Sequence, residues 1–242
     1  MKPITVLLLT IAILVPGCST RSISDSGYPE RGFYGQQSSN PLYQGELSEF
    51  DVLGIDAGAQ VSDQDIAAAF VTAPSRKFLR RGDPIMLIQS GAMIPDENMI
   101  DFLDESFSVT VFTGVPEADK SANASYSRSL RMAAARAGLG TIVVYWGVLE
   151  TGVKDLVTKS VSWVPIVGSV LPDEAQSMRI RLKVAVVDVR SGQWEMFTPR
   201  VMNEVAHSSR MNREGSDQAQ VAALKAESYQ LAAEWIIARY VK

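Results

Sequence analysis

The side chains that most often perform chemistry in proteins are scarce in this chain. Its 242 residues include one cysteine, Cys18, and one histidine, His207. A single cysteine excludes an internal disulfide framework and a cysteine-based zinc site, and a single histidine excludes a multi-histidine metal centre. General-base catalysis by histidine is restricted to one position. The sequence therefore predicts no metal site and no cofactor.

A few polar residues are nevertheless candidates for catalysis. Five acidic residues lie close together in the sequence: Asp96, Glu97, Asp101, Asp104 and Glu105. A carboxylate pair hydrolyses glycosides only at a defined separation in the fold, and a solvated helix side explains this spacing better. His207 is followed by two serines, but the members of a catalytic triad converge in space rather than in sequence.

Known catalytic motifs are missing from the sequence. The chain has no Gly-x-Ser-x-Gly nucleophile elbow and no phosphate-binding loop of the Gly-x-x-x-x-Gly-Lys type. We therefore expect a protein that is not an enzyme and has no catalytic residue. A hydrolase that uses His207 is the alternative.

The first residues have the organisation of a secretory signal. Lys2 supplies a positive start, residues 4–15 form an apolar run, and Gly17 and Cys18 follow. The run is too short for a transmembrane helix, which needs about 20 residues. Its length and its position suit the apolar region of a cleaved signal peptide.

Residues 15–18, Val-Pro-Gly-Cys, resemble the lipobox of bacterial lipoproteins. In that family the cysteine thiol receives a diacylglycerol, the signal is removed, and acyl chains such as palmitate hold the new N-terminus in a membrane. The resemblance implies a signal peptide over residues 1–17 and lipidation at Cys18. Ser19 rather than aspartate follows Cys18, which by enterobacterial sorting rules favours the outer membrane of the cell envelope. An ordinary signal followed by an incidental cysteine is the alternative.

The composition narrows the class of the remaining chain. There are 23 Lys and Arg residues against 27 Asp and Glu, and the net charge is −4. A mildly acidic chain has no excess of positive charge for a phosphate backbone, so we expect no nucleic-acid partner. The 46% of hydrophobic residues is ordinary for a globular protein.

The chain after the signal divides into two parts. Residues 18–46 are rich in Ser, Gly, Pro, Gln, Asn and Tyr and lack helical or strand periodicity. This composition predicts a flexible tether. Residues 47–242 are expected to form a single globular domain that faces the periplasm.

The pattern of this domain predicts an α/β (α+β) fold. We expect a mixed sheet with a βαβ unit, a C-terminal antiparallel hairpin, and packed helices that include a long C-terminal one. The expected strands are 84–89, 107–113, 141–149, 178–189 and 193–197, with a turn at 190–192. The expected helices are 62–73 with Ile66, Ala69 and Phe70 buried, 95–105, 121–137 ending at Gly138, and 219–241, and residues 207–217 are expected to be a loop.

Two stretches resemble a known group of envelope proteins. They are residues 140–149 (GTIVVYWGVL) and residues 181–193 (RLKVAVVDVRSGQ). They are similar to the corresponding segments of the curli-secretion channel lipoproteins, the lipoprotein activators of penicillin-binding proteins, and the N-terminal domain of TolB. The resemblance implies a small periplasmic α/β scaffold.

The segment 151–176 differs from the pore-forming members of that group. Its apolar part, residues 161–171, does not alternate cleanly and is interrupted by Pro165 and Gly168. Transmembrane β-strands alternate over about 9–11 residues, so we expect a surface loop or a short helix here. Trp163, Ile166 and Val167 are the candidate contacts with a partner or a membrane surface. Ordinary packing over the sheet edge is the alternative.

Together these patterns favour a lipid-anchored interaction or assembly module of the bacterial envelope. Its partners would be the membrane, through Cys18, and an unidentified envelope protein. A homo-oligomer, as in an outer-membrane secretion or transport assembly, is the alternative.

Overall fold

The computed structural model describes residues 19–26, 40, 42–56, 58–72, 79–116, 123–155, 174–200, 202–208 and 213–241. The described strands are β1 (Ser19–Ser22), β2 (Pro84–Gln89), β3 (Ser108–Phe112), β4 (Thr141–Asp155), β5 (Glu174–Asp188), β6 (Trp194–Phe197) and β7 (Met202–Ser208). The helices are η1 (Ile23–Asp25), α1 (Glu49–Leu53), α2 (Asp63–Thr72), α3 (Glu97–Asp104), α4 (Asn123–Arg136) and α5 (Arg213–Tyr240).

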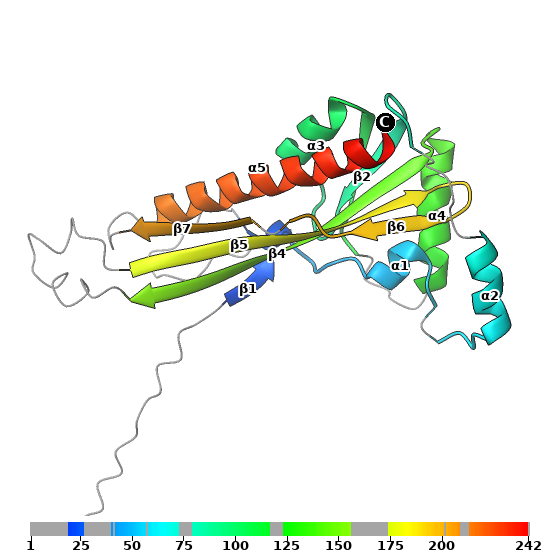
Figure 1. The fold of residues 1–242 in the computed structure, drawn as a ribbon, viewed down its shortest axis with the longest axis horizontal. Coiled ribbons are helices and arrows are strands. Elements are labelled where there is room, and N and C mark those ends of the chain that lie inside the picture. Colours follow the sequence, from blue (N-terminus) through cyan, green and yellow to red (C-terminus); the bar gives the residue numbers. More distant parts are fainter. Residues whose placement is uncertain are drawn as a thin grey trace, which may run out of the picture.

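The described strands form one mixed sheet with the order β3-β2-β4-β5-β6 (Figure 1). β2 is parallel to β3 and to β4, whereas β5 is antiparallel to β4 and to β6. β1 extends the sheet beside the outer part of β4, and β7 does so beside the outer part of β5. The predicted mixed sheet, βαβ unit, antiparallel hairpin and long C-terminal helix are thus confirmed.

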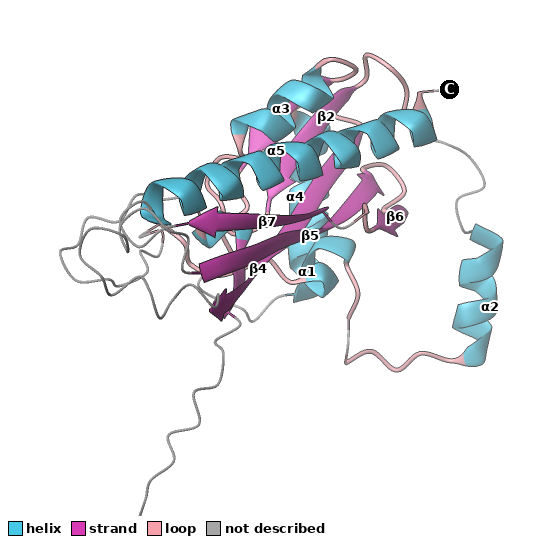
Figure 2. Ribbon diagram, turned by 60° about the vertical axis from the view of Figure 1, so that its left-hand side comes forward, coloured by secondary structure: helices cyan, strands magenta, loops and turns pink. Residues whose placement is uncertain are grey.

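Helices cover both faces of the sheet (Figure 2). α3 and α5 lie over one face, on which Val143, Tyr145 and Leu149 of β4 are buried. α1 and α4 lie over the other face, against Val144 and Trp146 of the same strand. Alternate residues of one strand therefore enter two different apolar clusters, because side chains of a strand point to opposite faces in turn.

Glycines end elements where a left-handed backbone is required. Gly138, after α4, has φ +76°, and Gly192, in the turn between β5 and β6, has φ +75°. In the turn, the Gly192 amide donates to the Asp188 carbonyl at 2.8 Å. Both positions were predicted from the sequence, because only glycine adopts such a backbone without steric cost.

The N-terminal region differs from the predicted tether. Within 18–46, residues 19–22 form β1, and Ile23 is fully buried in the cluster beneath α5. Residues 42–47 lie along the body and end at the buried Leu47. The polar composition was misleading because backbone pairing with an existing strand needs no apolar periodicity.

The polar segment at 207–217 also differs from its prediction as a loop. His207 belongs to β7, where it pairs with Ala175, and α5 begins at Arg213 rather than at residue 219. Strands β4 and β5 continue to Asp155 and from Glu174, well into the predicted insertion. β7 can be polar because the extended β5 supplies its hydrogen-bonding partners.

Helix α2 forms as predicted, but its side chains are not buried. Ser62 begins it with a reciprocal cap, in which the Asp65 amide donates to Ser62 Oγ at 3.2 Å and Ser62 N donates to Asp65 Oδ2 at 2.9 Å. Ile66, Phe70 and Val71 are 48%, 79% and 86% exposed. The helix stands away from the sheet in both ribbon views (Figures 1 and 2). The expectation that Ile66, Ala69 and Phe70 pack on the core is therefore wrong.

This placement predicts unequal costs for two truncations. Phe70→Ala is expected to change the free energy of unfolding by less than about 0.5 kcal/mol, because Phe70 makes little apolar contact. Leu87→Ala, at a fully buried position of β2, is expected to cost about 2–5 kcal/mol. Urea unfolding of the two variants tests this, and a large loss for Phe70→Ala would contradict the exposed position of α2.

Candidate functional site

Most site residues predicted from the sequence lie outside the described residues. These are Cys18, Trp163, Ile166 and Val167. The described chain begins directly after the first of them, since Ser19 is the first residue of β1 and pairs with Thr151 of β4. The polar groups that surround this N-terminal segment form the candidate site.

The N-terminal segment is held to the sheet by a close apolar contact. β1 pairs antiparallel with β4, and the chain then turns Ile23 inward over Gly147. A Cβ atom at Gly147 would lie 2.6 Å from Ile23 Cδ1 and 2.7 Å from Leu182 Cδ2. Only a glycine leaves room for Ile23 at this depth, so the sequence of β4 is fitted to the segment that covers it.

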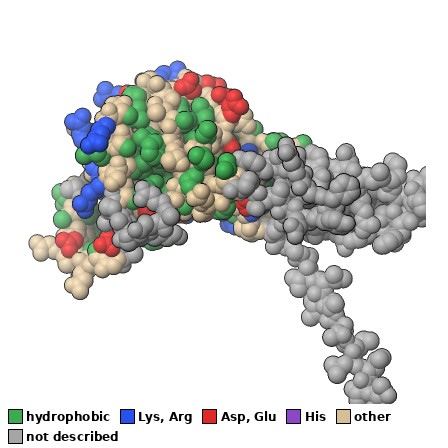
Figure 3. Space-filling view, turned by 180° about the vertical axis from the view of Figure 1, so that it is seen from behind, with side chains coloured by type: hydrophobic (Ala, Val, Ile, Leu, Met, Phe, Trp, Pro, Cys, Tyr) green, Lys and Arg blue, Asp and Glu red, His purple; other side chains and the backbone are tan. Residues whose placement is uncertain are grey.

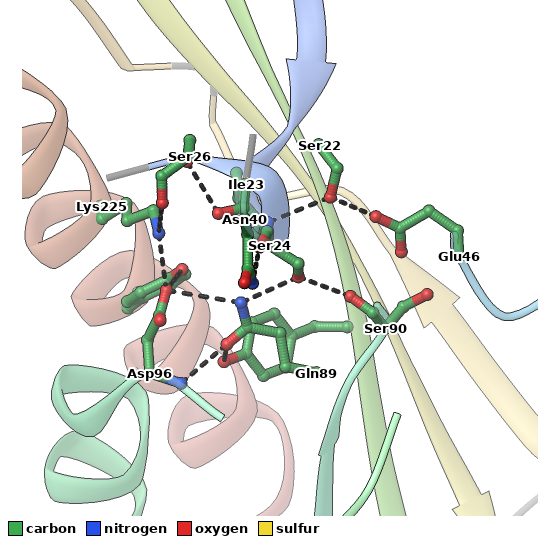
Figure 4. A network of polar contacts seen from close by, with 12 residues as sticks. Ser22, Ile23, Ser24, Ser26, Asn40, Glu46, Gln89, Ser90, Asp96 and Lys225 are labelled. Atoms are coloured by element: carbon green, nitrogen blue, oxygen red, sulfur yellow. Dashed lines mark hydrogen bonds and ion pairs between the residues drawn. The ribbon is translucent and has the colours of Figure 1, made fainter. Parts of the chain in front are cut away.

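Polar contacts continue from Ile23 to the end of β2 (Figure 4). Ser24 Oγ donates to the Ser90 carbonyl at 2.6 Å and accepts from Gln89 Nε2 at 3.0 Å. Asn40 Nδ2 donates to the Ser24 carbonyl at 3.0 Å. Gln89, Ser90, Ser24 and Asn40 are all buried. Because unpaired buried polar groups are costly, these bonds tie the segment to the sheet strongly.

Asp96, at the start of α3, collects donors from several elements. Lys225 Nζ of α5 lies 3.0 Å from Asp96 Oδ2, and Tyr229 donates its hydroxyl proton to the same oxygen. The Asp96 amide donates to Gln89 Oε1 at 2.7 Å, and Tyr145 OH donates to that oxygen at 2.6 Å. The cluster therefore joins β2, β4, α3 and α5 at one point.

The two tyrosines of this cluster are suited to donating hydrogen bonds rather than to transferring protons. Burial raises the pKa of Tyr145 well above its usual value, and the charge of Asp96 adds to the effect. The pKa of Tyr229 is also raised, by burial first and then by Tyr145 and Asp96. Both hydroxyls therefore stay protonated at neutral pH and hold the elements together by hydrogen bonds. We call this buried cluster the polar lock; it consists of Ser24, Gln89, Ser90, Asp96, Tyr145, Lys225 and Tyr229.

A second N-terminal stretch covers the same end of the sheet. The Leu47 amide donates to Ser90 Oγ at 2.8 Å, and Trp146 Nε1 donates to the Leu47 carbonyl at 2.8 Å. Tyr43 lies so close to Gly91 that a Cβ atom there would be 2.7 Å from the ring. Residues 22–26, 40 and 42–47 thus cover the carboxyl end of β2, where ligands bind in open α/β sheets.

A cleft of about 690 Å³ lies beside the lock. Trp146, Val148 and Leu182 provide apolar lining, and charged side chains surround them: Arg21, Glu46, Glu49, Glu150, Arg181 and Lys183. Several of these charges already pair, because Arg179 and Arg181 contact Glu150 and Lys183 contacts Glu49. The cleft therefore has an apolar lining between largely compensated charges.

Glu46 is a charged group of the cleft whose carboxylate is only partly satisfied by hydrogen bonds. Its Oε1 accepts from the Ser22 hydroxyl, whereas Oε2 is buried and has no hydrogen bond of good geometry from the described residues. Burial raises the pKa of Glu46 above its ordinary value, although hydrogen bonds from Ser22, Ser90 and Tyr43 oppose the shift. Its ionisation should therefore be linked to stability.

The other sequence-derived candidates do not join the lock. Among the described residues, no group of three His, Cys, Asp or Glu side chains is placed to hold a metal ion. The acidic residues Glu97, Asp101, Asp104 and Glu105 are exposed, as expected of a solvated side, and acidic side chains gather at the top of the body in Figure 3. No described helix is both long enough and apolar enough to span a bilayer.

A family model described as YafT bacterial lipoprotein matches residues 48–239. The chain belongs to this family of bacterial lipoproteins. The lipoprotein class predicted from residues 15–18 is thereby confirmed, from a part of the chain that does not include them.

Other comparisons add little about the YafT-family protein. No curated protein matches the sequence. A similar solved structure is the hypothetical protein CT253 from Chlamydia trachomatis, at 15% identity and a TM-score of 0.26. That likeness covers 66% of this chain and 95% of the other.

Apart from Asp96, which was one of the five acidic candidates, the lock residues were missed by sequence reasoning, with one partial signal. Gln89 ends an otherwise apolar strand, and a polar residue at the inner end of a buried strand indicates a specific partner. Nothing in the sequence shows that the partner is Ser24, because the two residues are far apart in the chain.

The contact of Ile23 with Gly147 predicts the effect of filling that space. Gly147→Val should displace Ile23 and lower the free energy of unfolding by about 1–3 kcal/mol. Displacement of β1 should also expose Arg21, so trypsin cleavage there should accelerate. Gly140→Val is the matched control, since a Cβ at Gly140 meets no atom within 4 Å. Equal losses in the two variants, or unchanged protection of Arg21, would contradict the docking.

The raised pKa of Glu46 predicts a pH dependence. Below its ordinary pKa both the folded and unfolded states are protonated, and as pH rises the unfolded state ionises first. This carboxyl therefore destabilises the fold progressively from its ordinary pKa up to its raised pKa in the folded state, and above that pKa the loss stays constant. The stability of Glu46→Gln relative to the native chain should rise over that range in urea unfolding. A difference in stability between Glu46→Gln and the native chain that stays constant with pH would contradict the assignment.

Proposed function

We propose that the protein is a lipid-anchored module of the bacterial envelope that acts by interaction rather than catalysis. It would be attached to the outer membrane through Cys18 and face the periplasm. There it would serve as an accessory or assembly factor for an envelope protein. Membership of a lipoprotein family supports the anchor, and the lock supports the non-catalytic role.

One observation carries the proposal. The residues that directly follow Cys18 are part of the sheet, and they fill the carboxyl end of β2 with the chain's own polar groups. In α/β sheets this end is where a substrate or cofactor usually binds. In this protein the N-terminal segment that fills this end would instead connect the lipid anchor to the sheet. Such a connection is what a protein positioned by its anchor requires.

Exposed apolar groups offer surfaces for a partner. Phe70 and Val71 of α2 are the most exposed large apolar side chains in the described part of the chain. Trp163, Ile166 and Val167, between β4 and β5 in the sequence, remain the contacts proposed from composition. Apolar surface of this kind is typical of interaction sites.

We also propose that the fold is related to the scaffold of the curli-secretion lipoproteins, the lipoprotein activators of penicillin-binding proteins and the N-terminal domain of TolB. Residues 140–149, which carry part of that resemblance, form most of β4, and residues 181–193 form the second half of β5 and the turn that leads to β6. Their antiparallel pairing is compatible with the shared scaffold.

Replacement of the lipidated cysteine tests the proposal. Cys18→Ser should release the protein from the membrane fraction, because the acyl chains supply the attachment at about 0.8 kcal/mol per buried CH₂. Ser19→Ala is the control, since it keeps the cysteine, and it should fractionate with the native chain. Mass spectrometry of the N-terminal peptide of the native protein should find an acylated Cys18.

Two results would overturn the anchor. One is an unmodified thiol or a retained signal in the native host, and the other is unchanged fractionation of Cys18→Ser. In-cell crosslinking of the native protein, followed by identification of the partner, then tests the interaction role. A lipidated protein that turns over a substrate with the lock intact would overturn the non-catalytic part alone.

A further inference from the structure

The register of β1 indicates from which side the chain enters the body. Ser19 pairs with Thr151 and Ser22 pairs with Val148, so β1 runs antiparallel to β4. The chain therefore arrives from the outer end of the β4–β5 pair, the end at which β4 stops at Asp155. In Figure 1 this end lies at the left, opposite to α2.

The distance from the anchor to this end is short. Cys18 is joined directly to Ser19, and consecutive Cα atoms are about 3.8 Å apart. No spacer lies between a lipidated Cys18 and the folded sheet. Wherever the acyl chains enter a bilayer, the outer end of β4 and β5 must therefore be close to its surface.

The two long strands continue past the position of the anchor. Beyond Gly152, which would stand opposite Cys18 if β1 were continued by one residue, three further pairs follow: Val153 with Gln176, Lys154 with Ala175, and Asp155 with Glu174. At about 3.3 Å per residue they extend roughly 10 Å further. The polar zone on each side of a bilayer is about 5–8 Å thick. Strands perpendicular to the membrane would therefore extend through this zone, and strands tilted from the perpendicular would lie along it.

We propose that the outer end of the β4–β5 pair, residues 153–155 and 174–176, docks on the phospholipid surface that holds Cys18. This rests on the lipidation put forward under the proposed function. The partner is the headgroup layer of the anchoring membrane. The opposite end, with α2 and the β5–β6 turn, faces away from that membrane.

Fluorescent labelling at the two ends tests the orientation. In the lipidated protein the sulfur of Cys18 is a thioether, so a cysteine introduced elsewhere is the only free thiol. Lys154→Cys places a label at the outer end, and Ser191→Cys places the matched label in the β5–β6 turn. Each protein is labelled with an environment-sensitive dye and reconstituted into vesicles of phosphatidylethanolamine and phosphatidylglycerol that carry a headgroup nitroxide.

The expected result is several-fold stronger quenching at residue 154 than at residue 191. Equal quenching at the two positions, or stronger quenching at 191, would overturn the orientation. Thermal unfolding first confirms that both labelled variants fold like the native chain. Lys154→Cys in a Cys18→Ser chain, which lacks the anchor, should lose most of the quenching, and full retention of it would overturn the dependence on the anchor.

Vesicle flotation separates this inference from the proposed function. A protein that does not float with vesicles fails as a lipid-anchored module, and the orientation fails with it. A protein that floats but shows no difference between the two labels keeps its anchor and contradicts only the docking of the outer end.

Discussion

The contact between Ile23 and Gly147 makes the N-terminal segment a docked part of the sheet rather than a free tether. With a side chain at residue 147 the space for Ile23 would close, because its terminal methyl and that of Leu182 lie within 3 Å of the missing Cβ. The glycine costs conformational freedom in the middle of a strand. The cost is offset by burial of Ile23, an apolar side chain whose removal from water contributes about 1.5–3 kcal/mol.

The polar lock depends on that contact. Ser24 follows Ile23 directly, and it reaches Gln89 and Ser90 only while Ile23 holds the segment against β4. Were the segment to leave, Gln89 would lose a partner at a site from which water is largely excluded, and each buried unpaired group costs about 1–3 kcal/mol. Apolar burial of Ile23 and polar pairing of Ser24 therefore favour the same docked state of the segment.

The parts that sequence reasoning predicted correctly are those whose signal is local. β5 alternates Met178, Ile180 and Leu182 inward with Arg179 and Arg181 outward, as its pattern indicates. Gly138 and Gly192 mark turns that few other residues allow. β1 and β7 were missed because their structure comes from pairing with distant strands, and α2 was given a buried face because periodicity does not show whether a partner face exists. Gln89 gave a hint of the lock, but its pairing with Ser24 is a long-range contact that one sequence cannot reveal.

A docked N-terminus would change what the proposed lipid anchor does mechanically. A flexible tether of some 30 residues would let a domain rotate freely above a membrane and move to any position within the length of the tether. With Cys18 lipidated as proposed, a chain that enters the sheet at Ser19 would lose that freedom, and the long axis of the sheet would become the axis along which the protein projects. β5, with 15 residues, is about 50 Å long at 3.3 Å per residue. On the orientation proposed above, an upright body would hold α2 and its exposed apolar side chains about that far from the bilayer. A partner for α2 would then lie deeper in the periplasm rather than at the anchoring membrane. The register of β1 on β4 sets the direction of the strands, and this direction would determine where such a partner can bind.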